Sequence, residues 1–341
     1  MRPAILFAAA ILAAFVTPAQ AAEEDARAWL GRMGEALGTR NYYGLFTHTT
    51  NGQSETMRIV HRVDGDGTHE RLVSLDGSGR EIVRTANEVH VYLPDRKVVL
   101  VEPRTDRGSL IKAFPAPSAQ LDALYDLSVS PGSRILGRDV QVLDIRPRDQ
   151  FRYGYRLWLD AETAMPLRSI VADGTGRVVE AIHFTRLEMP ERIAASATEA
   201  SVDATGFQWV RTGRQPATSA AAATAAAWRP MKMPPGFRLV GSRIQRMPGV
   251  PMPVQHLIFS DGFASVSVFI EPGPAAGPAP PEATSVGSAN AFSTSIQGHV
   301  VTAVGEVPPD TVRDIAVSVA PVTPGATDSL PVQSLAPSPP P

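Results

Sequence analysis

Apolar and polar residues alternate with a period of two along much of the chain, and turn residues separate the alternating runs. The first five runs predict strands at residues 55–63, 68–75, 81–86, 88–93 and 97–102. Between them stand "DGDG", "DGSG", "AN" and "PDRK", and Asp-Gly supplies the positive φ angles that tight hairpins need. The pattern therefore predicts an antiparallel sheet in which strands pair with their neighbours in sequence.

Two segments break this alternation with helical spacing. Residues 24–37 repeat apolar side chains at i, i+3 and i+4 until Gly38 ends the helix, and residues 118–127 form a second candidate helix with Ser118 as N-cap. Further strands are predicted at residues 133–136, 139–146, 151–160, 167–172 and 177–187. Roughly ten strands with two helices predict a strongly curved sheet whose concave face must be filled.

The concave face can be filled by side chains or can leave room for an acyl chain, and core filling is the commoner outcome. In "FRYGYRLWLD" one row of side chains alternates with Arg152, Arg156 and Trp158, and residues 88–93 carry a comparable apolar row. Which row faces inward stays open at this point. The candidate residues of an acyl-chain hollow are Tyr153, Tyr155, Leu157, Leu159, Val89, Val91 and Leu93.

Composition divides the chain after this sheet. Residues 22–211 form the first predicted domain, residues 212–227 are an Ala-rich linker, and residues 228–320 form the second domain. The proline-rich residues 271–283 interrupt the second domain as an extended loop, and residues 321–341 form a disordered tail. Within the second domain "QHLIFSDGFASVSVFIEP" predicts a hairpin, and turn chemistry explains its Asp261 better than acid or base catalysis.

The first 21 residues are typical of a secretory signal peptide. Arg2 precedes an apolar run, and Ala19-Gln20-Ala21 is an A-x-A cleavage signal. The sequence has no cysteine, which excludes disulfides and thiolate metal sites, and the style of composition favours the periplasm. Cleavage leaves 31 basic against 34 acidic groups, a balance that does not indicate nucleic acid.

No catalytic or metal-binding motif stands out in the sequence, and no cofactor is predicted. The histidines match none of the familiar catalytic or metal-binding spacings. In "HRVDGDGTHE", residues 61–70, two histidines and three carboxylates crowd together, but the spacing fails as a calcium loop. We interpret this segment as a hairpin whose polar flanks face water. A hydrolase assembled from distant residues stays as an alternative, and loss of activity on mutating one of the seven histidines would support it.

A cationic stretch opens the second domain. From Trp228 to Val250 the chain has no acidic residue, and methionines are interleaved with the basic ones. Such a stretch attracts an acidic peptide or the phosphates of a lipid head group, although a solvated sheet edge has the same composition. The candidate binding residues are Arg229, Lys232, Arg238, Arg243 and Arg246.

Four segments in order carry a family resemblance over nearly the whole mature chain. They are "YDLSVSPGSRILGRDVQVLDIRPRDQFRYGYRLWLDAETAMPLRS", "WRPMKMPPGFRLV", "MPVQHLIFSDGFASVSVFIE" and "GHVVTAVGEVPPDTVRDIAVSV". The set resembles the RseB/MucB family of periplasmic regulators of the envelope-stress sigma factor. The resemblance implies a mainly β (α+β) fold, with a LolA-like half-open antiparallel barrel covered by helices and a smaller β-sheet domain with a helix.

The resemblance also implies a function. Proteins of this family bind the periplasmic part of a membrane-spanning anti-sigma factor and shield it from proteolysis, lipopolysaccharide or a lipoprotein-like signal releases them, and they are not enzymes. The cationic stretch would then contact the anti-sigma factor or an anionic head group, and the hollow would admit acyl chains. The alternative is a periplasmic lipid or lipoprotein carrier, which does not need the second domain. A homo-oligomer is compatible with the sequence.

Overall fold

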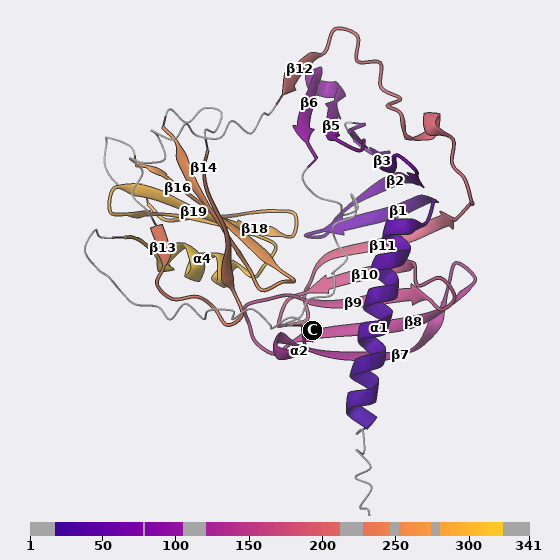
Figure 1. The fold of residues 1–341 in the computed structure, drawn as a ribbon, viewed down its shortest axis with the longest axis horizontal. Coiled ribbons are helices and arrows are strands. Elements are labelled where there is room, and N and C mark those ends of the chain that lie inside the picture. The colour runs from indigo at the N-terminus through magenta and orange to yellow at the C-terminus, as the bar shows by residue number, and fades with distance from the viewer. Residues whose placement is uncertain are drawn as a thin grey trace, which may run out of the picture.

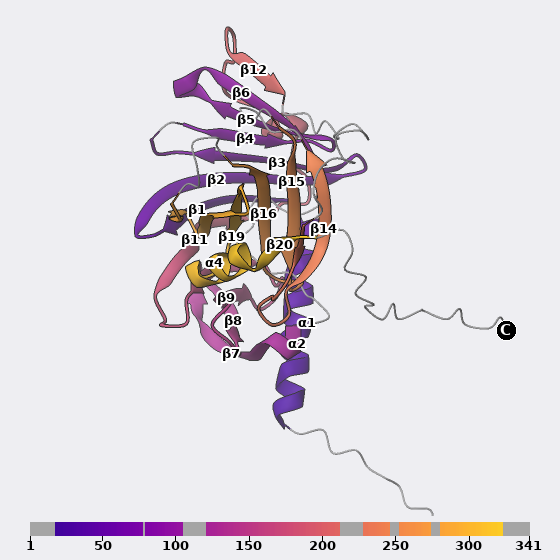
Figure 2. The same cartoon turned by 90° about the vertical axis from the view of Figure 1, so that its left-hand side faces the viewer.

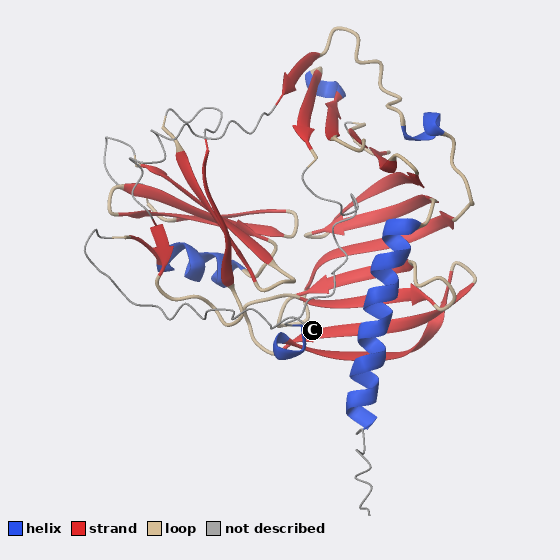
Figure 3. Cartoon of the chain, viewed as in Figure 1, coloured by secondary structure: helices blue, strands red, loops and turns tan. Residues whose placement is uncertain are grey.

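The computed structural model describes residues 18–77, 79–104, 121–211, 228–245, 252–273 and 280–322. The predicted linker, Arg246 and most of the predicted tail and signal peptide lie outside these ranges. The described chain forms two mainly β domains, each with a helix against its sheet (Figures 1 and 3). The larger sheet has the strand order β12-β6-β5-β4-β3-β2-β1-β11-β10-β9-β8-β7.

Neighbours in sequence pair antiparallel through most of this sheet, as the hairpin turns predict. In the middle of the strand order, β1 pairs antiparallel with β11 and so joins the two halves of the meander. The strands are β1 (Tyr42–Thr50), β2 (Gln53–Asp64), β3 (Gly67–Ser74), β4 (Glu81–Arg84), β5 (Glu88–Leu93), β6 (Val98–Pro103), β7 (Tyr125–Ile135), β8 (Arg138–Pro147), β9 (Gly154–Asp160), β10 (Pro166–Ala172), β11 (Val178–Glu188) and β12 (Gln208–Arg211). Short 3-10 turns lie at Pro94–Arg96 and Ala195–Thr198.

Helix α1 (Pro18–Thr39) lies across one face of this sheet and fills its core (Figure 1). Leu30 and Met33 of the helix are fully buried, together with Ile59, Leu143 and Leu157 of the strands. The helical spacing of apolar residues therefore produced the stripe that covers the sheet. None of the helices in the described ranges combines the length and the apolar character that a membrane span requires.

Three details of this domain differ from the prediction. Helix α1 begins at Pro18 rather than at residue 24. In the predicted helix at 118–127, the described part holds only α2 (Leu121–Leu124), because Tyr125 starts β7 and pairs with β8. The sheet has twelve strands rather than ten, and β12 joins it by parallel pairing with β6. At Tyr125 and at β12, pairing with a neighbouring strand has overridden the local propensity of the sequence.

The outermost polar residues of the "DGDG" hairpin, His61 and Glu70, are buried, so the interpretation that its polar flanks face water is wrong for these two residues. The turn itself is as predicted, between β2 and β3. His61 Nδ1 lies 2.8 Å from Glu70 Oε1, Arg84 Nη1 donates to Glu70 Oε2 at 3.2 Å, and the His61 ring stacks on Tyr42. These four residues pair across neighbouring strands on the face that carries the buried Ile59. They therefore belong to the core.

The smaller domain is a six-stranded antiparallel sheet with helix α4 (Pro309–Ser318) against it. Its strand order is β14-β15-β16-β19-β18-β17, and its strands run crosswise to those of the large sheet (Figure 2). The strands are β14 (Arg238–Gln245), β15 (Val254–Ser260), β16 (Ser265–Pro272), β17 (Glu282–Val286), β18 (Ala289–Ile296) and β19 (His299–Gly305), and β13 (Trp228–Pro230) pairs separately with β20 (Val319–Pro321). The predicted hairpin is β15–β16, in which Val266, Val268 and Ile270 are buried.

Candidate partner-binding surfaces

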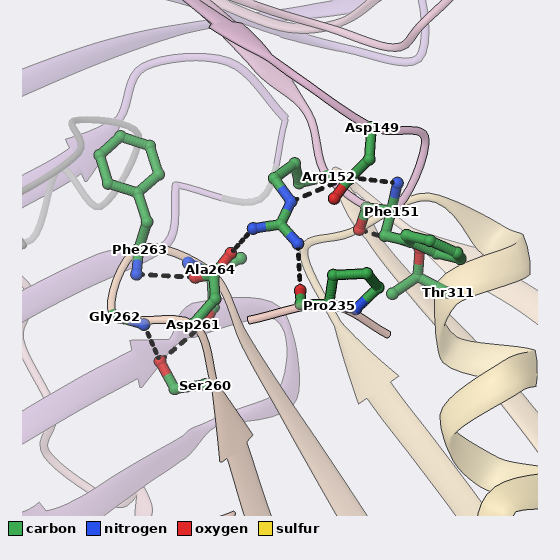
Figure 4. A network of polar contacts seen from close by, with 10 residues as sticks. All are labelled: Asp149, Phe151, Arg152, Pro235, Ser260, Asp261, Gly262, Phe263, Ala264 and Thr311. Carbon is green, nitrogen blue, oxygen red and sulfur yellow. Dashed lines mark hydrogen bonds and ion pairs between the residues drawn. The ribbon is translucent and has the colours of Figure 1, made fainter. Parts of the chain in front are cut away.

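The two domains meet around one buried arginine. Arg152, in the loop before β9, has a fully buried side chain and donates to acceptors on both domains (Figure 4). Its Nε donates to Asp149 Oδ1 at 3.0 Å within its own domain. Its Nη1 donates to Asp261 Oδ2 at 2.7 Å, and its Nη2 donates to the Pro235 carbonyl at 2.5 Å. All three contacts use a charged donor, which makes the junction directional as well as strong.

Asp261 has two roles in this junction, one for each carboxylate oxygen. Its Oδ1 accepts hydrogen bonds from the backbone N–H groups of Phe263 and Ala264, at 2.8 and 2.6 Å, and so shapes the β15–β16 turn. Its Oδ2 accepts from Arg152. The turn chemistry expected from the sequence is therefore present, and the same side chain also holds the other domain.

Aromatic and polar contacts surround this ion pair. The Phe263 ring lies 4.9 Å from the Tyr125 ring and 5.2 Å from the Tyr155 ring, centroid to centroid. Burial raises the pKa of Tyr125 far above its usual value, so its hydroxyl stays neutral. Gly236 is tightly fitted here, because it has φ +81° and an added Cβ would come within 2.8 Å of Leu124.

Helix α4, strand β18 and the turn between β17 and β18 add further contacts between the domains. Thr311 of α4 donates to the Phe151 carbonyl at 2.9 Å, and Asn290 donates to the Tyr153 hydroxyl at 2.9 Å. Burial raises the pKa of Tyr153, and the hydrogen bond from Asn290 opposes this shift. At a separate point Asn51, in the β1–β2 turn, donates to the Gly287 carbonyl at 2.8 Å.

A groove of about 540 Å³ opens beside the junction, between residues 231–235 and the C-terminal part of α4. Its lining is largely apolar, and it includes Phe151 of the larger domain. Met231 and Val317 are 63% and 55% exposed in this groove, so its walls are open to solvent. Lys232 and Asp314 are its charged lining residues.

The predicted cationic residues do not form one cluster. Arg229 lies in β13 and Lys232 lines the groove, whereas Arg238 and Arg243 lie on the edge strand β14. Arg243 donates to His256 Nδ1 through Nε at 3.1 Å and through Nη2 at 2.8 Å, so part of its charge is engaged within the domain. In the described part of the chain the stretch thus divides between the groove and the sheet edge.

The predicted hollow residues also divide. Leu157 and Leu159 are fully buried in the core that α1 covers, and Tyr153 and Tyr155 lie at the domain junction. Tyr155 also lines a cavity of about 670 Å³ at the ends of β8, β9 and β10. The second row is half-buried, and Val91 pairs with Ile82 of β4, next to the core. That row comprises Val89, Val91 and Leu93.

Sequence reasoning missed the junction, because its partners are far apart in the chain. Arg152 and Asp261 are separated by 109 positions, and no local pattern links them. Two features of the sequence point to this junction only indirectly. One is an arginine between aromatic residues in "DQFRYGY", and the other is the turn aspartate of an apolar hairpin. Among the described residues no cluster of three or more histidine or carboxylate groups could hold a metal ion.

Fold and junction together define the class: a two-domain, mainly β protein in which a large half-open antiparallel sheet is fastened to a smaller sheet beside an apolar groove. The family model for the MucB/RseB N-terminal domain matches residues 25–202, and the model for the MucB/RseB C-terminal domain matches residues 222–320. The chain therefore belongs to the MucB/RseB family.

Named relatives cover most of the chain. It is 36% identical over 301 residues to the sigma factor AlgU regulatory protein MucB of Pseudomonas aeruginosa, which covers 87% of this chain and 91% of the relative. It is 27% identical over 300 residues to the sigma-E factor regulatory protein RseB of Escherichia coli K12, which covers 86% of this chain and 89% of the relative.

Solved structures of MucB are similar over comparable lengths. The crystal structure of MucB in complex with MucA(peri) has a TM-score of 0.68 at 34% identity and covers 88% of this chain and 100% of that chain. The crystal structure of MucB alone has a TM-score of 0.58 at 32% identity and covers 88% of this chain and 98% of that chain.

Proposed function

We propose that this chain is a periplasmic regulator of an envelope-stress sigma factor. It binds the periplasmic part of a membrane-spanning anti-sigma factor and protects that part from regulatory proteolysis, and a lipopolysaccharide or lipoprotein-like signal releases it. One observation carries the proposal: the similarity to MucB in complex with MucA(peri) extends along 88% of this chain, through both domains. The names of the curated relatives, which are sigma factor regulatory proteins, support the same role.

Cations in the second domain support the contact with the partner. Arg238 is exposed on the edge strand β14, and Lys232 is exposed beside an apolar groove. Positive groups next to apolar surface favour an acidic peptide that also carries apolar side chains. Of the cations predicted from the sequence, Lys232 and Arg238 are exposed, whereas Arg229 is half-buried and Arg243 donates to His256.

Lipid recognition would use the larger domain. The half-buried row of Val89, Val91 and Leu93 and the cavity beside Tyr155 supply apolar surface there, whereas Leu157 and Leu159 already pack beneath α1. An acyl chain that reached these leucines would have to displace part of α1. We expect export through the signal peptide of residues 1–21, a non-catalytic role and no cofactor.

The test is capture of the partner by the purified mature chain. An envelope extract is passed over the immobilised protein, and the captured anti-sigma factor is then exposed to the first protease of the cascade with and without the chain. We expect capture of the anti-sigma factor and slower cleavage when the chain is present. Capture of an acylated lipoprotein instead would support the carrier, and capture of the anti-sigma factor without protection would contradict the shielding role.

A charge-reversal variant tests the cationic contact. Replacing Arg238 with Glu should weaken binding of the anti-sigma segment about tenfold at low salt, since an exposed charge acts through long-range attraction. Arg134→Glu is the matched control, because Arg134 is also exposed but lies on the larger domain. Equal affinities for both variants would remove Arg238 from the contact.

A further inference from the structure

The groove beside the domain junction has fixed walls. Residues 231–235 form one wall, and the C-terminal part of α4 forms the other. The Met231 N–H donates to the Ser318 carbonyl at 2.7 Å, which joins the two walls at one end. Phe151 lines the groove from the larger domain, and its carbonyl accepts from Thr311 of α4. The groove is therefore a built feature that includes parts of both domains.

Apolar side chains in this groove are more exposed than the fold requires. Met231 and Val317 are both more than half exposed, and the exposed Pro235 and half-buried Met233 lie beside them, whereas Val319 is buried. Single exposed apolar residues are common on protein surfaces, but several that share one groove mark a binding site. Methionine side chains adapt their shape to a partner, which suits them to contacts with aliphatic side chains.

The charge of the groove favours a partner that brings a carboxylate. Lys232 lines the groove, and in the described part of the chain no carboxylate forms an ion pair with it. Asp314, the acidic lining residue, lies 3.7 Å from Arg313 Nε, and the closer partner of Arg313 is Asp310 at 3.0 Å. Lys232 is thus the lining cation with which an occupant's carboxylate can pair, so an occupant that carries a negative group beside its apolar part is complementary to that side of the groove.

We propose that this groove binds aliphatic side chains of a peptide segment whose neighbouring carboxylate pairs with Lys232. The proposal rests on the proposed function, because the peptide is the periplasmic segment of the anti-sigma factor. A peptide fits better than an acyl chain. Pockets for small ligands bury 70–90% of the ligand surface or more, whereas the walls of this groove stay largely open to solvent.

An occupant of the groove also contacts residues of the domain junction around Arg152. Pro235 lines the groove and its carbonyl accepts from Arg152, and Phe151 lines it next to Arg152 in sequence. The peptide therefore touches residues of both domains at once, and its affinity depends on their docked arrangement.

Substitution of exposed groove residues can test peptide binding without disturbing the fold. Met231→Glu and Val317→Glu place a charge in the groove at residues that are largely in solvent, so the fold is expected to survive. Val286→Glu is the matched control, because Val286 is 80% exposed on β17 of the same domain and does not line the groove. Synthetic peptides that tile the periplasmic segment are titrated by calorimetry, and thermal unfolding checks each variant.

We expect each groove variant to weaken binding of one peptide about tenfold or more, and Val286→Glu to change it less than about twofold. Lys232→Glu should weaken binding of the same peptide. Replacing the peptide's carboxylate residue with lysine should restore the affinity of this variant. Wild-type affinity in a Met231→Glu, Val317→Glu double variant would overturn the groove assignment while leaving the proposed function intact. If the wild-type chain binds no peptide and no intact segment, the proposed function itself fails.

Binding of a single-chain dodecyl amphiphile tests whether the groove holds a lipid instead of a peptide. If dodecyl phosphate below its micelle concentration binds the wild-type chain and Val317→Glu abolishes this binding, while the peptides bind both proteins equally, the groove belongs to an acyl chain and the peptide assignment is overturned. If Val317→Glu weakens peptide binding and leaves binding of dodecyl phosphate unchanged, the peptide assignment stands.

Discussion

Two buried ionic clusters hold this molecule together in different ways. In the larger domain, Glu70 joins His61 and Arg84 across neighbouring strands, and between the domains Arg152 joins Asp149 and Asp261. The partners in the first cluster are 9 and 14 positions apart, whereas Arg152 and Asp261 are 109 apart. The first cluster lies within one sheet. The second cluster joins two separate sheets and forms only when the two domains are docked.

The difference decides what happens when one partner is lost. A charge left unpaired inside a sheet can reach water only if the sheet opens. A charge left unpaired between domains can reach water when the domains part, which leaves each core intact. The first cluster therefore controls folding of the larger domain, and the second controls the coupling between domains.

Glu70→Gln should have the largest effect on stability. Arg84 would remain buried beside a neutral amide, and breaking a buried pair in this way costs about 3–5 kcal/mol. Chemical denaturation with a tryptophan fluorescence readout measures the loss. A double variant, Glu70→Leu with Arg84→Met, should recover much of it because the buried guanidinium is removed together with its carboxylate. A single variant as stable as wild type would contradict the assignment.

Arg152→Met should have a smaller effect on global stability and a larger one on domain coupling. We expect a loss of about 2 kcal/mol, at the low end for a truncated buried charge pair at an interface, since parting of the domains hydrates Asp261. Calorimetry should show the unfolding transition splitting in two, and small-angle scattering should show a larger radius of gyration.

Arg156→Met is the matched control for this coupling. Arg156 also pairs with a carboxylate, in its case bidentately with Asp144, but its side chain is 48% exposed and the pair lies within one domain. Its replacement should leave a single transition and an unchanged radius of gyration. If Arg152→Met behaves in the same way, the junction does not couple the domains.

Arg134→Met should have the smallest effect, with no measurable change in the unfolding midpoint at neutral pH. Arg134 and Asp139 are each 71% exposed, so water screens their pairing. The hydrogen bond from Arg134 lowers the pKa of Asp139, and the variant should return that pKa toward its ordinary value in an NMR titration. Because the folded pKa is depressed, the pair's small contribution exists at neutral pH and disappears as the pH falls through it.

Local features of the fold were predictable because hairpins are encoded locally. The strand at residues 88–93 matches β5, and the turn residues placed its neighbours within a few positions. The parallel pairing of β12 with β6 joins Gln208 to Val98, and no turn or period signals such a distant contact. His61 and Glu70 were misplaced because a polar residue in a period-two run resembles an outward-facing one until its partner, Arg84, is known.

The same limit applies to the candidate site. The first role of Asp261, in the turn, follows from Ser-Asp-Gly between two apolar runs. Its second role depends on where another domain is placed, and that placement is not written in any local pattern. The cationic stretch was visible as composition, but its division between Lys232 in the groove and Arg238 at the sheet edge needed the three-dimensional structure.

The way the two domains are tied by the chain has a mechanical consequence. The connection leaves the larger sheet from β12, whose Trp209 is 49% exposed, and enters the smaller domain at β13, whose Trp228 is buried. A load pulled along this connection would rupture the four-residue β12 first, because it peels from a sheet edge with little burial to resist it. Detachment of β12 would lengthen the connection between the domains while both hydrophobic cores and the pairing of β13 with β20 stay intact.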